Sequence, residues 1–169
     1  MVKNVPVGAN VVIEPVVPAS WVQDPGHPTL TTRDGNRWTK YHSLQYVADD
    51  GSLGAVVNIE DYERTLHPSL IDYYERNGFC WVITGSTQEG RALAQPLSVP
   101  DAVAYYQRLG QVGQVVYRAS PYGAGAKPVA FNFDWAFDFY PLAYARPGPE
   151  MVVYHLTGGA CAAVGSAVP

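Results

Sequence analysis

The chain has 169 residues, the length of one ordinary domain, and its 11 basic and 15 acidic residues give a net charge of −4. The basic residues are scattered singly, so we predict no nucleic-acid partner. With 16 Gly, 14 Pro and only 15% charged residues, the composition favours turns and long ordered loops and excludes a coiled coil or a helical bundle. No apolar run reaches membrane-spanning length and no export signal is recognisable, so we expect that this chain by itself neither spans a membrane nor directs export.

Five segments have strand signals. Residues 9–14 form an apolar run that ends at Glu14, and residues 79–84 form a second run that is long enough for a central strand. The other predicted strands cover residues 38–41, 114–119 and 151–156. The rest of the stretch from residue 15 to residue 58 is punctuated by Pro, Gly and Asp, and we expect it to be mainly irregular.

Two segments have helix signals. Residues 68–77 begin with Pro in the first turn, place apolar residues on one face and end before a Gly. Residues 98–110 begin with Ser98 and Asp101, which resemble a capping box with Asp in the Glu position, and we expect Gly110 to stop this helix.

Each predicted helix leads directly into a predicted strand, and two such units favour a largely parallel sheet. We therefore predict a single α/β domain over residues 1–169. Its expected architecture is a three-layer sandwich with a mostly parallel or mixed central sheet and long ordered loops. We expect residues 161–169, which are rich in Gly and Ala, to form a loose tail.

The chain contains two cysteines, too few for a disulfide scaffold and without the spacing of a zinc site. Cys80 opens an apolar run, and Cys161 lies in the Gly- and Ala-rich tail. The residues alone leave two interpretations open. Either a disulfide anchors the tail, or Cys80 is a buried apolar thiol and Cys161 is a loose one.

Familiar catalytic motifs are missing from the sequence. There is no Gly-x-Ser-x-Gly elbow, and the paired glycines Gly123 and Gly125 lie in a loop where they make a poor phosphate cradle. The four histidines have neither the His-x-His nor the His-Glu-x-x-His spacing. We therefore predict no metal and no cofactor.

Two groups of acids are candidates for chemistry. The run from Glu60 to Arg64 contains three acids that suit general acid–base catalysis, but a solvated acidic approach to a helix is the favoured interpretation. Glu14 ends the first predicted strand, so its carboxylate would lie at the carboxyl edge of a parallel sheet, where ligands of such folds bind. Alternatively, Glu14 accepts hydrogen bonds from the loop over residues 15–58 in a purely structural role.

The most unusual segment is an aromatic ladder from Phe131 to Phe139, in which every second residue is aromatic. The opposite face of an extended segment here would carry Asn132, Asp134 and Asp138, which suit either a half-buried strand or a site for a hard cation or sugar hydroxyls. The ladder itself suits core filling, stacking on a sugar ring or contact with a membrane–water interface.

Several blocks together resemble one known kind of sequence. They are Glu14-Pro-Val-Val-Pro with Trp21 and Asp24, Arg37-Trp38 with Lys40-Tyr41, Glu60-Asp-Tyr-Glu-Arg-Thr, Gly78-Phe-Cys-Trp-Val-Ile-Thr-Gly-Ser-Thr-Gln, Val99-Pro with Tyr105-Tyr106, Ser120-Pro-Tyr, Phe131-Asn-Phe-Asp-Trp-Ala-Phe-Asp-Phe-Tyr-Pro-Leu-Ala-Tyr and Arg146-Pro-Gly-Pro-Glu. The chain resembles the C-terminal soluble domain of bacterial polytopic membrane glycosyltransferases that use lipid-phosphate-linked sugars, relatives of the protein O-mannosyltransferases. The likeness runs from about Asn4 to Cys161, and the Phe-x-Phe-Asp-Trp block is its most specific part.

In that family the catalytic acids lie between transmembrane helices that precede this domain, so the resemblance assigns no catalytic residue here. It implies an accessory domain on the extracytoplasmic face of the bacterial cytoplasmic membrane. The implied partners are the transmembrane region of the parent enzyme, a glycan or lipid-linked sugar, and the membrane surface. Because disulfides persist outside the cytoplasm, the resemblance also favours a bridge between Cys80 and Cys161.

Three functions follow as hypotheses. The first is an accessory domain that covers the membrane active site and helps to bind acceptor or donor, without catalysis of its own. The alternative is a stand-alone carbohydrate-binding module, and a third is a small-molecule enzyme built around Glu14 and Glu60. The candidate ligand-binding residues are Glu14, Trp38, Tyr122, Asn132, Asp134, Trp135 and Asp138.

Overall fold

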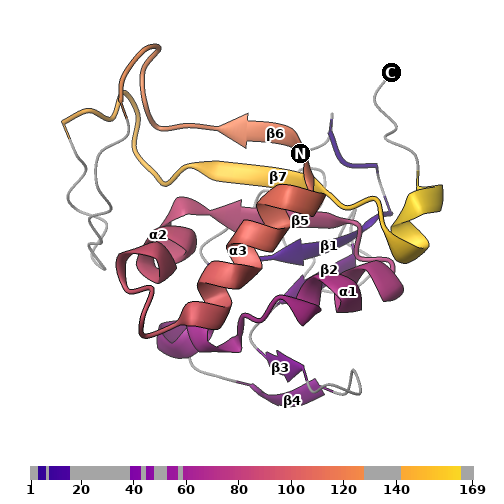
Figure 1. Ribbon diagram of the computed structural model, residues 1–169. Helices are drawn as coiled ribbons and strands as arrows, with labels where there is room; N and C mark the ends of the chain where they lie inside the picture. Colours follow the sequence, from indigo (N-terminus) through magenta and orange to yellow (C-terminus); the bar gives the residue numbers. More distant parts are fainter. Residues whose placement is uncertain are drawn as a thin grey trace, which may run out of the picture.

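The computed structural model describes residues 4–6, 8–15, 39–42, 45–47, 53–56, 59–127 and 142–164 (Figure 1). The strands are β1 (Asn10–Ile13), β2 (Thr39–His42), β3 (Gln45–Val47), β4 (Leu53–Val56), β5 (Trp81–Gly85), β6 (Gln114–Ala119) and β7 (Met151–His155). The α-helices are α1 (Ser69–Arg76), α2 (Ser86–Ala94) and α3 (Pro100–Val112), and the 3-10 helices are η2 (Ile59–Thr65) and η3 (Gly159–Ala163). Every predicted strand therefore has a counterpart whose ends differ from the prediction by at most two residues, and β6 matches its predicted range without any difference.

The main sheet has five strands in the order β2-β1-β5-β7-β6, and β3 pairs with β4 in a separate antiparallel hairpin. Strand β1 is parallel to both β2 and β5, whereas β7 is antiparallel to its neighbours β5 and β6. The chain thus places β2 on one side of β1 first and β5 on the other side later. This makes β1 the point where the strand order reverses, and it confirms an α/β fold with a mixed sheet.

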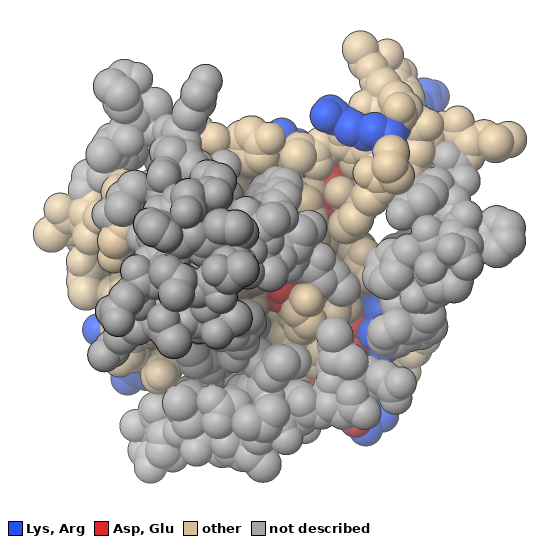
Figure 2. All heavy atoms as spheres, turned by 180° about the vertical axis from the view of Figure 1, so that it is seen from behind, with Lys and Arg blue, Asp and Glu red and all other residues tan. Residues whose placement is uncertain are grey.

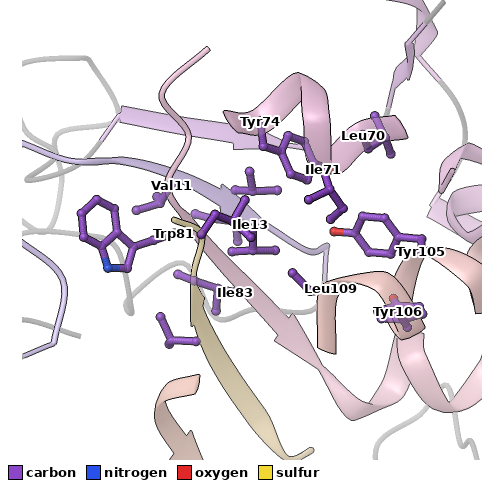
Figure 3. Packing of buried hydrophobic residues seen from close by; sticks show 14 of the residues in the cluster. Val11, Ile13, Leu70, Ile71, Tyr74, Trp81, Ile83, Tyr105, Tyr106 and Leu109 are labelled. Atoms are coloured by element: carbon purple, nitrogen blue, oxygen red, sulfur yellow. The ribbon is translucent and has the colours of Figure 1, made fainter. Parts of the chain in front are cut away.

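Both faces of the central strands are buried. Helices α1, α2 and α3 lie against one face (Figure 1). The side chains on that face include Val12 and Val82, which the register places opposite each other. On the other face the Trp81 ring points away from the helices and stacks on His155, with ring centroids 4.7 Å apart (Figure 3).

The core on the helical face is unusually rich in tyrosine. Tyr62, Tyr74 and Tyr105 are fully buried together with aliphatic residues of α1, α3 and the strands (Figure 3). Helix α1 supplies the apolar face expected from its spacing, since Leu70, Ile71 and Tyr74 are its buried residues. Hydroxyl-bearing rings in such a place need polar partners. Tyr62 has one in Glu14, and Tyr105 interacts with Tyr74.

The helices also correct the sequence predictions. Helix α2 was not predicted at all, although Ser86 and Glu89 have the spacing of a capping box directly after β5. Helix α3 begins at Pro100 without a side-chain cap, so the predicted cap at Ser98 is wrong.

Gly110 does not stop α3, which continues to Val112. The helix ends at Gly113, where a Cβ atom would lie 2.8 Å from the Leu109 carbonyl oxygen and 3.0 Å from the Tyr154 ring. A side chain at residue 113 would therefore clash both with α3 and with β7.

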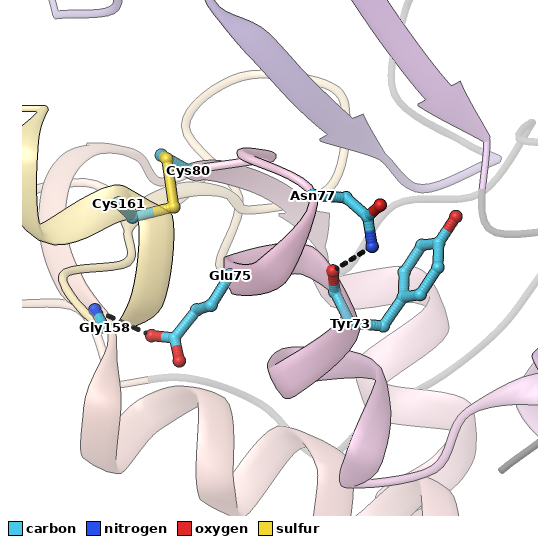
Figure 4. The surroundings of a disulfide bond; sticks show 6 residues. All are labelled: Tyr73, Glu75, Asn77, Cys80, Gly158 and Cys161. Atoms are coloured by element: carbon cyan, nitrogen blue, oxygen red, sulfur yellow. Dashed lines mark hydrogen bonds between the residues drawn. A yellow bond between two sulfur atoms is a disulfide. The ribbon is translucent and has the colours of Figure 1, made fainter. Parts of the chain in front are cut away.

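A disulfide joins Cys80, next to the start of β5, to Cys161 in η3 (Figure 4). Both cysteines are buried, and the described residues contain no free cysteine. The bridge expected from the resemblance is thus present. It fixes η3 beside α1, so Ala162 and Ala163 of the predicted tail belong to an ordered 3-10 helix, while residues 165–169 lie outside the described part.

A second contact holds η3 to α1. The Gly158 amide donates a 2.9 Å hydrogen bond to the Glu75 carboxylate (Figure 4). Gly159 has a φ of +49°, a left-handed backbone that glycine adopts without strain. The two glycines that precede the disulfide therefore allow the chain to turn tightly over the end of α1.

We expect Cys161→Ala to lower the free energy of unfolding by roughly 4 kcal/mol, because a bridge across 81 residues of sequence strongly restricts the unfolded chain. Urea unfolding with and without reductant measures the effect. The wild type should lose stability in reductant, and the variant should not respond. Two reactive thiols in denatured, unreduced wild type would contradict the bridge.

We expect Gly158→Ala to destabilise the protein by about 0.5–1.5 kcal/mol, because a Cβ atom at residue 158 would displace the Glu75 carboxylate and break its hydrogen bond with the Gly158 amide. Gly110→Ala is the matched control. Its Cβ atom meets nothing within 4 Å in the helix, so it should stabilise the protein by roughly 0.5–1 kcal/mol. Equal urea midpoints for the two variants would show that the Glu75 contact has no importance.

Candidate functional site

The site centres on Glu14, the residue that follows β1 at the carboxyl edge of the parallel strands. Its amide continues the ladder by donating to the Ile83 carbonyl oxygen at 3.2 Å. The side chain is only 1% exposed. The predicted position is therefore correct, at the place where the strand order reverses.

Donors from three other elements surround the Glu14 carboxyl. The Gly85 amide, at the junction of β5 and α2, donates to Oε2 at 2.7 Å. The Tyr106 hydroxyl of α3 donates to Oε1, also at 2.7 Å, and the side chain of Tyr62 in η2 adds a further hydrogen bond. We call these four residues the Glu14 cluster.

Burial raises the pKa of Glu14 to about 8, since removal from water disfavours the charged form. The hydrogen bonds from Gly85 and Tyr106 act in the opposite direction, while the nearby Glu89 adds to the increase. Burial exceeds the stabilisation by the donors, so the carboxyl is mostly protonated at neutral pH. The cluster is then a neutral network that joins four elements.

The tyrosines of the site are also neutral. Burial raises the pKa of Tyr106 and of Tyr105 well above the usual value, and the neighbouring Glu14 adds to both increases. A proton on Glu14 can be shared with tyrosine hydroxyls, but neither tyrosine can act as a base. The cluster can hold a proton, and at 1% exposure of Glu14 it offers that proton to no ligand in this conformation.

A second group of acids lies beside the cluster. Glu150, just before β7, pairs with Arg118 of β6, and its backbone exchanges hydrogen bonds with Ser86 at the start of α2. Burial raises the pKa of Glu89. The nearby Glu150 adds to this increase, and the nearby Arg118 opposes it. Figure 2 shows Asp and Glu side chains within a hollow of the rear face.

The acidic run over residues 60–64 differs from its expected solvated role. It forms most of η2, in which Tyr62 and Glu63 are buried and Asp61 is exposed. Glu63 lies 3.1 Å from Arg91 of α2, and burial raises its pKa despite this ion pair. The Glu60 side chain lies outside the described part, so its suggested catalytic role stays a prediction.

Of the other candidates, only Tyr122 is among the described residues, and it does not belong to the Glu14 cluster. Tyr122 lies on the connection between β6 and β7, where it forms an isolated bridge and an edge-to-face ring contact with Tyr144. The remaining candidates and the aromatic ladder lie outside the described residues: Trp38, Asn132, Asp134, Trp135 and Asp138.

The residues that sequence reasoning missed are the partners of Glu14. Sequence reasoning placed the hydrogen-bond donors to Glu14 in the loop over residues 15–58, whereas the donors in the described structure are Tyr62, Gly85 and Tyr106. One signal was present, because a tyrosine on the apolar face of a helix needs a partner for its hydroxyl. The identity of that partner depends on tertiary contacts.

Within the described ranges, no three His, Cys, Asp or Glu side chains are grouped so that they could hold a metal ion. In the same ranges, no helix combines the length and the apolar character needed to cross a membrane. No family model, curated protein or solved structure matches the chain. The functional argument therefore depends on the residues themselves.

We expect Glu14→Gln to change the pH dependence of stability. The folded protein keeps a proton on Glu14 up to about pH 8, whereas the unfolded chain releases it near 4.5. This contribution to the free energy of unfolding is complete below pH 4.5 and is lost as the pH rises towards 8, by up to about 1.4 kcal/mol per pH unit. Glutamine has no proton to lose, and its amide can donate to the Tyr106 hydroxyl.

Urea unfolding between about pH 5 and pH 8 measures this difference. The variant should gain stability relative to the wild type as the pH rises. Asp101→Asn, a change at an exposed carboxylate, is the control and should leave the slope as it is. If all three proteins gave parallel curves, Glu14 would be ionised throughout and our assignment of its proton would be wrong.

Proposed function

We propose that the chain is an extracytoplasmic accessory domain of a bacterial membrane glycosyltransferase that uses lipid-phosphate-linked sugars. In this proposal it packs over the membrane active site and helps to bind the acceptor or the lipid-linked donor. The catalytic acids are supplied by the transmembrane region of the parent enzyme. The proposal rests on the sequence resemblance, on the Cys80–Cys161 disulfide and on the Glu14 cluster.

The Cys80–Cys161 disulfide is the observation that carries the proposal. Disulfides persist in oxidising compartments and are rare in the cytoplasm, so the bridge supports a location outside the cytoplasmic membrane. Both cysteines are buried in the core, and the bridge anchors η3 to the start of β5. Such a bridge is part of the fold and suits a domain that matures after export.

The Glu14 cluster supports a role without catalysis in this domain. Glu14 has the raised pKa and the position of a general acid, but its oxygens already accept hydrogen bonds from Gly85 and Tyr106. A general acid must come within hydrogen-bond reach of its substrate. A carboxyl that is 1% exposed and already bonded is better suited to fixing β1 against α2 and α3.

We include the expected three-layer sandwich in this proposal. Val11, Ile13 and Ile83 share the sheet face opposite the helices, and all are buried. Apolar side chains on that face need a covering layer, as in other α/β sheets with both faces buried. The arrangement gives a rigid platform for loops at the carboxyl edge of β1 and β5.

The reading frame upstream of the Met1 codon tests the proposed function. We expect it to encode a series of apolar helices with acidic loops between them, in frame with this chain. Deleting the segment that encodes this chain should then reduce sugar transfer from a lipid-phosphate donor in isolated membranes. The purified chain should show no transfer. An in-frame stop codon directly before Met1, or transfer by the chain alone, would overturn the accessory role.

A further inference from the structure

Two connections project from the same end of the sheet. Strands β6 and β7 are antiparallel, with Ala119 and Met151 paired at the end where β5 finishes, so the connection between them leaves from that end. Helix α3 finishes one residue before β6, at the opposite end. A helix of 13 residues is about 20 Å long, so α3 begins near the end of β5, and the α2–α3 connection lies there too. Both connections are on the left of Figure 1.

These two connections carry the two most exposed leucines of the described chain. Leu97 is 97% exposed and Leu142 is fully exposed, while Leu93, in the last turn of α2 before the first connection, is 51% exposed. Large apolar side chains exposed to this degree mark interaction surfaces when they occur together at one end of a molecule. By contrast, the exposed Val112 lies at the opposite end, where α3 finishes.

The α2–α3 connection presents Leu97 on an ordered turn. The Gln95 amide donates to the Ala92 carbonyl at 3.2 Å, and the amides of Ser98 and Val99 donate to the Gln95 carbonyl at 3.0 and 3.3 Å. No charged residue occurs from residue 92 to residue 100. Leu97 therefore projects from a fixed, uncharged turn.

Basic side chains lie on the β6–β7 connection that carries Leu142. Lys127 and Arg146 are both exposed, and Arg146 is held by a 2.9 Å hydrogen bond from its Nε to the Ser120 carbonyl. Figure 2 shows Lys and Arg side chains on the projecting upper right of the rear view, which corresponds to this end. The exposed acid closest to the leucine turn in sequence is Asp101.

We propose that this end of the sheet docks on a phospholipid bilayer by inserting Leu93, Leu97 and Leu142 into the interface, with Lys127 and Arg146 near the lipid phosphates. This inference rests on the proposed function and assigns its membrane-facing surface. Separate projecting leucines give too small an area for a stable protein interface, which needs about 800 Å² per partner. Projecting apolar side chains beside cations do suit the region of a bilayer where acyl chains meet lipid phosphates.

Co-sedimentation of the full chain with vesicles tests the docking. The probes are vesicles of phosphatidylcholine alone and of phosphatidylcholine with about a third phosphatidylglycerol. We expect the chain to sediment with both, and more strongly with the anionic vesicles. Leu97→Ser should weaken the partition coefficient about tenfold on both, because it removes one inserted side chain.

Two further variants make the test specific. Val112→Ser changes an exposed apolar residue at the opposite end, and its partition coefficient should equal that of the wild type. Arg146→Gln should lose about fivefold on anionic vesicles and nothing on phosphatidylcholine alone. Circular dichroism checks that each variant is folded, which we expect because the replaced side chains are exposed.

Several outcomes would overturn the docking surface. They are absence of the wild type from both vesicle pellets, equal partition of Leu97→Ser and wild type, or a dimer in solution that Leu97→Ser dissociates. The last result would assign these leucines to contact between two copies of the chain. If docking fails while the upstream frame encodes a membrane enzyme, the proposed function stands and only its membrane-facing surface is wrong. If docking succeeds but the upstream frame encodes no membrane enzyme, the docking surface stands and the proposed function is wrong.

Discussion

The fold depends on a single buried carboxyl group at the point where the strand order reverses. Glu14 accepts hydrogen bonds from Gly85, Tyr106 and Tyr62, so one side chain joins β1 to the start of α2, to α3 and to η2. A buried polar group without partners costs several kcal/mol, roughly 2–7, and this requirement fixes where each donor must stand. Fully paired networks of this kind make a core unique, because any other packing would leave a member without its bond.

The elements that local signals define were predictable from the sequence. Pro68 and the apolar spacing of Leu70, Ile71 and Tyr74 were enough to place α1, since all of this information lies within one short segment. The predicted stop at Gly110 was wrong, since α3 continues to Val112, and the close approach of Gly113 to the Tyr154 ring involves a distant strand that no local signal shows. The expected sheet was mostly parallel or mixed, and the observed sheet is mixed. Nothing inside residues 151–156, however, shows that β7 is the strand that runs antiparallel between β5 and β6.

The candidate site was predictable only at its centre. An acid directly after an apolar strand marked Glu14, but its donors lie 71 and 92 residues further along the chain. The cysteine pair shows a similar limit. The residues alone left two interpretations open, and a separation of 81 residues gives no local evidence for a bridge. Only the resemblance to extracytoplasmic domains favoured it.

The position of β7 also determines the order of events when the protein is made. Met151–His155 follows every other described strand in the sequence, yet it is an inner strand that separates β5 from β6. Until the ribosome has made it, β5 and β6 have no ladder between them, and Cys161 has not yet followed to reach Cys80. Sheet completion and disulfide closure therefore both wait for the segment that contains β7 and η3. A nascent chain of this design stays incompletely folded until that segment has emerged from the ribosome.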